Sequence, residues 1–284
     1  MFCPAKDHDR RTFLGLLTVG LAATIAGCSA TGSSSGGSAT GAATPTGTPG
    51  AQQVGGPATA PGTLPPVPPP TAGPTVVLDH GPADTNKIVL TVDDGYCADC
   101  VSGYVRFAQT TGIHLTFSPN GTYAAEWQPH AAALRPLIEA GQVQIMNHTF
   151  SHADLRKLTD AKIRDELERN DAWVTRNFGI TTRPYYRPPY GFHNAHIDGV
   201  AAELGYTRTV LWNGSYADSE LITPQFLMTQ AEKYLKPGVI MLGHANHPTV
   251  LGLFDQIAAL IRQRDLTPVT LDEMFGTSRA SGRA

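Results

Sequence analysis

From about residue 75 onward, short apolar runs of strand length alternate with longer segments in which apolar residues recur at helical spacing. The predicted strands are Lys87 to Val92, His114 to Ser118, Gln142 to Asn147, Pro184 to Arg187, Thr207 to Trp212, Val239 to Gly243 and Pro268 to Leu271. The predicted helices are Val101 to Thr111, Gln128 to Ala140, Asp160 to Phe178, Asn194 to Leu204, Pro224 to Leu235 and Val250 to Arg264.

This alternation predicts an α/β fold with a parallel sheet and crossover helices. Because about seven such units follow one another in roughly 200 residues, a single distorted (β/α) barrel is favoured over an open sheet. The clearest helix begins after Thr159, which is the expected N-cap, and its apolar stripe continues to Phe178.

The first 28 residues have the pattern of an export signal. Arg10 and Arg11 precede an apolar run from Leu14 to Ala26, which is too short for a comfortable bilayer span. The paired arginines resemble a twin-arginine signal, and the small residues before Cys28 resemble a bacterial lipobox. We therefore expect a lipid on Cys28 to hold the protein at the membrane. The alternative is a membrane-anchoring helix with an incidental cysteine, and either way the rest of the chain is extracytoplasmic, facing the cell wall or periplasm.

The next segment has the composition of a tether. Residues 29–74 are almost entirely Gly, Ala, Ser, Thr and Pro, so they cannot bury enough apolar surface to fold. Residues 75–276 are the predicted folded domain, and residues 277–284 are expected to be a flexible tail. A flexible coil of the tether's length would average roughly 40 Å from end to end.

The charge balance limits the kinds of binding partner that the chain can have, and the cysteine content limits its possible disulfides. With 21 Lys and Arg against 24 Asp and Glu, the chain has no basic surplus that would favour nucleic acid. A neutral sugar polymer fits this balance, and we expect a monomer. Beyond the export signal only Cys97 and Cys100 remain, either as a small disulfide loop or as two free thiols.

Polar groups that can titrate or bind metal follow four of the predicted strands, where a parallel barrel gathers its functional side chains. They are Asp93-Asp94-Gly95, His148-Thr149-Phe150-Ser151-His152, Arg187-Pro188-Pro189-Tyr190-Gly191 and His244. Taken singly, each has an ordinary interpretation as a turn, a surface pair or a loop residue. Two histidines four residues apart can meet on one side of a helical turn and bind one metal ion.

The order of these motifs resembles the polysaccharide deacetylases of carbohydrate esterase family 4, the NodB-like domain. Thr91-Val92-Asp93-Asp94-Gly95, the two-histidine motif, the arginine motif and Ile240-Met241-Leu242-Gly243-His244 correspond to four of its five sequence blocks. The resemblance covers about Lys87 to Met274 and implies a metal-dependent hydrolase. It also implies a three-ligand metal site of Asp94, His148 and His152, with zinc as the default metal and cobalt or nickel as alternatives.

The resemblance also implies roles for five further residues. Asp93 is the expected general base and Arg187 its charged partner, while the backbone N–H of Tyr190 is the expected oxyanion donor. His244 is the expected general acid, and Asp218 its partner. Adjacent residues of a strand point to opposite sides, so a turn at Gly95 would be needed for Asp93 and Asp94 to act at the same metal site.

The fourth block departs from the family pattern. Where the family has an Asp-Trp pair, this chain has Asp218 followed by Ser219, so that Asp218 could also be an ordinary solvated turn residue. Either Trp212 or Tyr216 could supply the missing apolar wall for the acetyl methyl group. The nearby His247 is expected to be a loop residue, because the metal already has its protein ligands.

The function implied by the resemblance is hydrolysis of N-acetyl groups on a cell-wall glycan, either peptidoglycan or a chitin-like polymer. One alternative is an O-acetyl esterase acting on a polymer such as xylan. A second, from a different class, is a non-catalytic, metal-containing wall-binding lipoprotein.

Overall fold

The computed structural model describes residues 69–276. The twin-arginine motif, Cys28, most of the expected tether and the C-terminal tail lie outside the described residues. Residues 69–75 form no helix or strand, and the first strand begins at Val76. None of the helices in the described range is both long and apolar enough to cross a bilayer.

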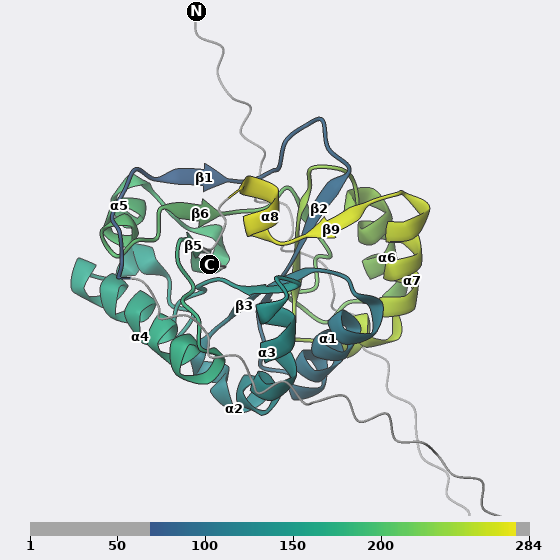
Figure 1. Cartoon of the computed structure of the whole chain (residues 1–284), viewed down its shortest axis with the longest axis horizontal. Helices are drawn as coiled ribbons and strands as arrows, with labels where there is room; N and C mark the ends of the chain where they lie inside the picture. Colours follow the sequence, from purple (N-terminus) through teal and green to yellow (C-terminus); the bar gives the residue numbers. More distant parts are fainter. Residues whose placement is uncertain (1–68, 277–284) are drawn as a thin grey trace, which may run out of the picture. The chain divides into compact units, whose positions relative to one another are not determined.

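Nine short strands form the centre of the domain (Figure 1). They are β1 (Val76–Leu78), β2 (Lys87–Asp94), β3 (Leu115–Pro119), β4 (Val143–Ile145), β5 (Tyr185–Tyr186), β6 (Arg208–Val210), β7 (Gly214–Ser215), β8 (Ile240–His244) and β9 (Thr267–Val269). They form one sheet in the order β1-β6-β5 and a second in the order β4-β3-β2-β8-β7, with β9 pairing with the start of β2. Every strand pair in these sheets is parallel, which confirms the predicted α/β class.

Helices surround the strands (Figure 1). They are α1 (Ala98–Thr111), α2 (Ala124–Trp127), α3 (Ala131–Glu139), α4 (Asp160–Phe178), α5 (Ala195–Glu203), α6 (Pro224–Tyr234), α7 (Phe254–Gln263) and α8 (Leu271–Phe275). The predicted bounds of α4 are those observed, although no hydrogen bond from the Thr159 side chain caps it. The helix predicted from Val250 begins only at Phe254, because Pro248–Gly252 form a 3-10 turn.

Two isolated bridges join the two sheets. Asn147, just after β4, pairs with Tyr186 of β5, and His80, just after β1, pairs with Val239 beside β8. Within residues 69–276 the strands do not close into one continuous sheet. The two bridges connect the sheets to each other, as expected for a distorted barrel. All seven predicted strands are present, whereas β1 and β7, of 3 and 2 residues, were too short to be recognised from sequence.

Strand β2 shows how the sequence directs its side chains. Successive residues of a strand point to opposite faces. Ile88, Leu90 and Val92 belong to the core that also contains the buried faces of α1, α3, α4, α6 and α7, while Val89 packs among residues of the other strands. Asp93 continues the side of Val89, inside the barrel. The same alternation that buries β2 therefore delivers a carboxylate to the barrel interior.

Candidate metal centre and active site

Asp94 turns its side chain away from the strand alternation at the end of β2. Its φ is 66°, and that of Gly95 is 111°, so the left-handed turn begins one residue before the predicted turn at Gly95. A Cβ on Gly95 would lie 2.1 Å from Nε1 of Trp127, whose indole N–H donates to the Asp94 carbonyl at 2.9 Å. Asn246 Nδ2 donates to Asp94 Oδ2 at 2.8 Å and fixes the carboxylate.

His148 and His152 lie on the loop that follows β4. They meet without a helical turn, because Thr149 and His152 have φ values of 66° and 59°, which no right-handed helix contains. His148 Nδ1 lies 2.8 Å from the Arg187 carbonyl, so this nitrogen carries a proton and Nε2 is the nitrogen that faces Asp94. Asn120 Nδ2 donates to the carbonyls of His148 and Thr149 at 2.6 and 3.0 Å and holds the loop.

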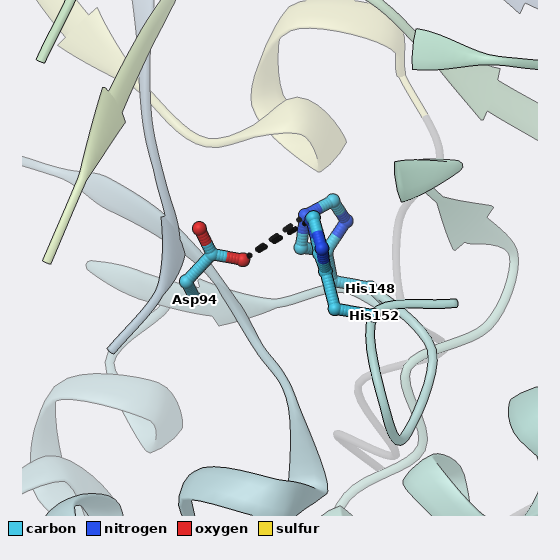
Figure 2. Close-up of side chains that lie close together, drawn as sticks. All are labelled: Asp94, His148 and His152. Carbon is cyan, nitrogen blue, oxygen red and sulfur yellow. Dashed lines mark ion pairs between the residues drawn. The ribbon is translucent and has the colours of Figure 1, made fainter. Parts of the chain in front are cut away.

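The carboxylate of Asp94 and the two imidazoles point toward one another (Figure 2). Asp94 Oδ1 is 3.4 Å from His148 Nε2 and 3.5 Å from His152 Nε2, and all three ligand atoms lie within 4.8 Å of one another. Ligand atoms about 2.1 Å from a tetrahedral ion are separated by about 3.4 Å. Asp94 Oδ1 is also buried without a hydrogen-bond partner. The donor set and its spacing therefore fit a divalent transition metal ion.

The charges of the three residues agree with a cation site. Burial raises the pKa of the Asp94 carboxyl, but the close approach of His148 and the charges of both histidines together lower it far below the usual range. Burial and the charge of His148 lower the pKa of His152 to about 4, so its imidazole is neutral near pH 7. Burial also lowers the pKa of His148, but the negative charges of Asp93 and Asp94 raise it by more, so the net pKa lies above its usual value. The two carboxylates therefore favour a positive charge between them and the histidines.

Asp93 and Arg187 form a buried ion pair beside the metal site. Arg187 Nη1 donates to Asp93 Oδ1 at 2.7 Å and to Thr91 Oγ1 at 2.8 Å, and the arginine is 0% exposed. The other Asp93 oxygen, Oδ2, lies 3.5 Å from His148 Nε2. One face of Asp93 is therefore neutralised while the other faces the metal ligands.

His244 lies next to Asp93, because the two are register partners on the adjacent strands β8 and β2. Asp218, which follows β7, accepts from His244 Nδ1 at 2.9 Å and from the His244 backbone N–H at 3.1 Å. Burial lowers the pKa of His244, but the hydrogen bond and charge of Asp218 raise it by more, with a net rise above the usual value. The interpretation of Asp218 as a solvated turn residue does not fit, because it is 3% exposed.

Two aromatic residues lie beside the site: Tyr190 next to His152, and Trp212 next to Arg187. Tyr190 has a φ of 61°, is 55% exposed, and its ring centroid is 4.6 Å from that of His152. The Trp212 ring lies against Gly191 and its centroid is 5.6 Å from the Arg187 guanidinium. Tyr216 is instead 4% exposed within the core beneath the helices, so of the two candidates for an apolar wall only Trp212 is near the site.

Sequence reasoning missed the residues that hold the ligands in place. Asn246, Trp127 and Asn120 carry no metal-binding or acid–base pattern of their own, and Trp127 lies 33 residues from Asp94. Of these three residues, only Asn246 could have been suspected from the sequence, because it follows His244 on the loop after a buried strand. The structure also joins Cys97 and Cys100 in a disulfide, which the sequence left open.

Comparison with known proteins shows which proteins this chain resembles. Residues 80–209 match the family model described as polysaccharide deacetylase, a range that includes Asp93 and Arg187 but ends before Asp218 and His244. Chitin deacetylase of Arthroderma benhamiae is 28% identical over 199 residues, which cover 68% of this chain and 53% of the relative. The peptidoglycan-N-acetylmuramic acid deacetylase PdaA of Bacillus subtilis is 24% identical, covering 69% of this chain and 73% of the relative.

Solved structures share the fold. T48 deacetylase, determined with substrate, superimposes with a TM-score of 0.60 at 28% identity, covering 69% of this chain and 94% of that one. A carbohydrate esterase family 4 pseudoenzyme from Bacillus anthracis superimposes with a TM-score of 0.62 at 16% identity, covering 70% and 68%. Since the fold occurs in both, the side chains of the site carry the chemistry. Residues 80–209 of the chain thus match the polysaccharide deacetylase family model, and the relatives named as deacetylases support a hydrolase acting on carbon–nitrogen bonds.

Proposed function

We propose that this protein is a metal-dependent deacetylase that removes N-acetyl groups from a cell-wall glycan, with peptidoglycan or a chitin-like polymer as substrate. The observation that carries the proposal is the convergence of Asp94, His148 and His152 beside a second carboxylate, Asp93. A glycan is favoured over other amides because relatives named for chitin and for peptidoglycan share this domain.

Asp94, His148 and His152 would hold one divalent ion, with zinc first and cobalt or nickel as alternatives. When bound, such an ion supplies a Lewis acid that polarises the acetyl carbonyl and makes water more acidic. The imidazole of His152 is already in the neutral state that metal binding requires, whereas His148, whose pKa is raised by Asp93 and Asp94, would release its Nε2 proton when the ion binds.

Asp93 is the proposed general base. Arg187 holds one of its oxygens, so the other is oriented toward the metal ligands, where it can take the proton from the attacking water. The backbone N–H of Tyr190, on the left-handed turn after Arg187, is the proposed hydrogen-bond donor to the developing oxyanion.

His244 is the proposed general acid. Its Nδ1 proton is held by Asp218, which leaves Nε2 to donate a proton to the departing amine. The raised pKa of His244 favours the protonated imidazole that this role requires. An amine is a poor leaving group unless it is protonated, whereas an alkoxide from an ester needs less help. Changing His244 to Ala should therefore reduce amide turnover far more than ester turnover.

The export features support action outside the cytoplasm. A lipid on Cys28 would anchor the chain to the membrane, and the segment from residue 29 to 74 would let a monomeric domain reach into the wall. Radiolabelled palmitate incorporation, lost when Cys28 is changed to Ala, would test this anchor.

The function is tested by acetate release from peptidoglycan, chitooligosaccharides and acetylated xylan, before and after chelation and after zinc is added back. We expect release from an N-acetylated glycan that stops on chelation and returns with zinc. Faster release from xylan than from either N-acetylated substrate would instead favour an O-acetyl esterase. If the purified chain holds one zinc ion yet releases acetate from none of the three, the deacetylase proposal is wrong.

A further inference from the structure

The buried stripe of helix α4 is interrupted by two polar residues. Ile163, Leu167 and Val174 recur at helical spacing and are buried. Glu166 and Asn170, which lie one turn apart on the same side of the helix, are also buried, at 7% and 0% exposure. In the part of the chain that the structure describes, no cationic side chain forms an ion pair with the Glu166 carboxylate. Burying a charge without a countercharge is costly, so this carboxylate points to a role beyond filling the core.

Glu166 holds the residue that precedes a metal ligand. The Ser151 backbone N–H donates to Glu166 Oε2 at 2.7 Å, and the Ser151 hydroxyl donates to Oε1 at 2.7 Å. One carboxylate therefore holds residue 151 at two points. The next residue is His152, whose φ of 59° is a conformation that persists only where surrounding contacts enforce it. Glu166 supplies such contacts from α4, directly beside the strained residue.

Asn170 holds the other end of the same loop. Its Nδ2 donates to Asn147 Oδ1 at 3.1 Å, and Asn147 directly precedes His148. Asn147 Oδ1 also accepts from the Thr149 N–H at 2.9 Å, so this side chain spans the first histidine ligand. The two ligands are four residues apart on an irregular loop, whereas the two α4 residues that hold the preceding positions are four apart on a helix, where they are separated by about 6 Å along the axis. The helix therefore provides the rigid spacing that the loop lacks.

His152 depends on such indirect support more than the other two ligands do. Asp94 is fixed by Asn246. His148 Nδ1 donates to the Arg187 carbonyl. Within residues 69–276, by contrast, no group accepts a hydrogen bond from Nδ1 of His152. Because metal-binding histidines ordinarily donate this second N–H to a fixed acceptor, the place of this imidazole has to be set through its backbone.

We propose that Glu166 is a positioning residue for the metal ion: by holding Ser151 it places the His152 imidazole where it can share one ion with the other two ligands. The proposal rests on the metal-dependent function proposed above. The role requires the length of the Glu166 side chain, because both oxygens have to reach residue 151. A glutamine keeps that length, and its amide can accept from the Ser151 N–H and donate to the hydroxyl oxygen. An aspartate keeps the charge but is shorter by one C–C bond, about 1.5 Å, so it cannot keep both contacts unless the loop moves.

The test measures the zinc affinity of the full-length chain by competition with a chromophoric chelator. Glu166→Asp and Glu166→Gln are compared with Glu168→Asp, a matched control on the exposed face of α4. Glu166→Asp should bind zinc about tenfold or more weakly than the wild type, whereas Glu166→Gln should stay within about threefold and the control should be unchanged. Zinc binding by Glu166→Asp that is as tight as in the control would overturn the proposal. A loss in Glu166→Gln as large as that in Glu166→Asp would also overturn it, because the charge rather than the reach of the side chain would then matter.

Two further measurements separate positioning from a purely structural role. Urea unfolding in excess chelator reports the stability of the metal-free fold, and a structural role would lower that stability without changing the zinc affinity of the folded chain. The visible absorption of bound Co²⁺ reports the coordination geometry, and it should change in Glu166→Asp but not in the control.

None of these measurements needs a glycan. If the wild type releases acetate from no glycan, the proposed function fails, but the comparison of Glu166→Asp with Glu166→Gln still decides the role of Glu166. If the wild type releases acetate while Glu166→Asp binds zinc as tightly as the wild type, the positioning role is wrong and the proposed function stands.

Discussion

Changing Arg187 to Met tests the buried ion pair that orients the proposed base. Arg187 Nη1 donates to Asp93 Oδ1 and Thr91 Oγ1, while Nε and Nη2 donate to the carbonyls of Val210 and Leu211 at 3.3 and 3.2 Å. A methionine side chain fills much of the same volume but makes none of these contacts. The substitution therefore leaves the Asp93 carboxylate buried, at 2% exposure, without its countercharge.

The magnitude follows from these contacts. Removing one partner of a buried ion pair costs about 3–5 kcal/mol, because the remaining charge loses its partner without regaining water. Two carbonyls that lose a donor add roughly 1 kcal/mol each, so the expected loss is about 5–7 kcal/mol. That is a large fraction of the roughly 5–15 kcal/mol that stabilises a typical domain. Changing Arg187 to Lys should cost less, since an ammonium group can still pair with Asp93 but cannot reach both carbonyls.

The assay is urea unfolding in excess chelator, so that metal binding does not contribute to the measured stability. Asp93→Asn and the double variant complete a cycle, and we expect the double variant to be more stable than the sum of the two single losses predicts. Arg169→Met, which removes a half-exposed arginine 3.5 Å from Asp165, is the matched control and should have a much smaller effect. A loss below about 1 kcal/mol for Arg187→Met would refute the reasoning, because no buried uncompensated charge would then have been created.

Two further predictions concern the groups that support the acid and the metal. Changing Asp218 to Asn removes the charge that raises the pKa of His244, and because the general acid must be protonated, the alkaline limb of the kcat/KM profile should move to lower pH. An unshifted alkaline limb would show that His244 is not the acid or that Asp218 does not tune it. Changing Asn246 to Ala removes the donor that orients Asp94 Oδ2, so zinc affinity, measured by competition with a chromophoric chelator, should fall about 10- to 100-fold. Unchanged affinity would mean that the carboxylate is oriented without Asn246.

Much of the active centre could be predicted because each motif follows a buried strand. Apolar runs such as Ile88 to Val92 give the strand its position, and parallel strands bring their carboxyl ends to one rim. The polar groups that follow, Asp93 and His244, were placed together by that argument, and register pairing puts them side by side. The pattern of hydrophobicity along the chain therefore contains the location of the site.

Local backbone conformation was beyond this reasoning. The sequence pattern did not show that the left-handed turn would begin at Asp94, or that His148 and His152 would meet on an irregular loop rather than a helical turn. A positive φ at a non-glycine residue is costly and persists only where surrounding contacts enforce it. At Asp94 those contacts come from Trp127 and Asn246, which are distant in sequence.

Contacts between loops were equally out of reach. Tyr96, Tyr123 and His247 come from three separate connections, and nothing in their sequence neighbourhoods links them. His247 was expected to be an ordinary loop residue, and its contact with Tyr96 became visible only in the folded chain. Tyr216, one candidate for the missing apolar wall, directly follows the short strand β7 and is buried in the core beneath the helices. A strand of 2 residues gives too little pattern to predict which face each side chain takes.

The central claim is that Asp94 holds a metal ion while the adjacent Asp93 acts on the water. It is tested most directly by measuring zinc content and acetate release together in Asp94→Asn and Asp93→Asn. We predict that Asp94→Asn loses both the ion and activity, whereas Asp93→Asn keeps about one zinc ion per chain and loses at least 100-fold in acetate release. Substantial activity in zinc-loaded Asp93→Asn, or full zinc retention by Asp94→Asn, would contradict this division of labour.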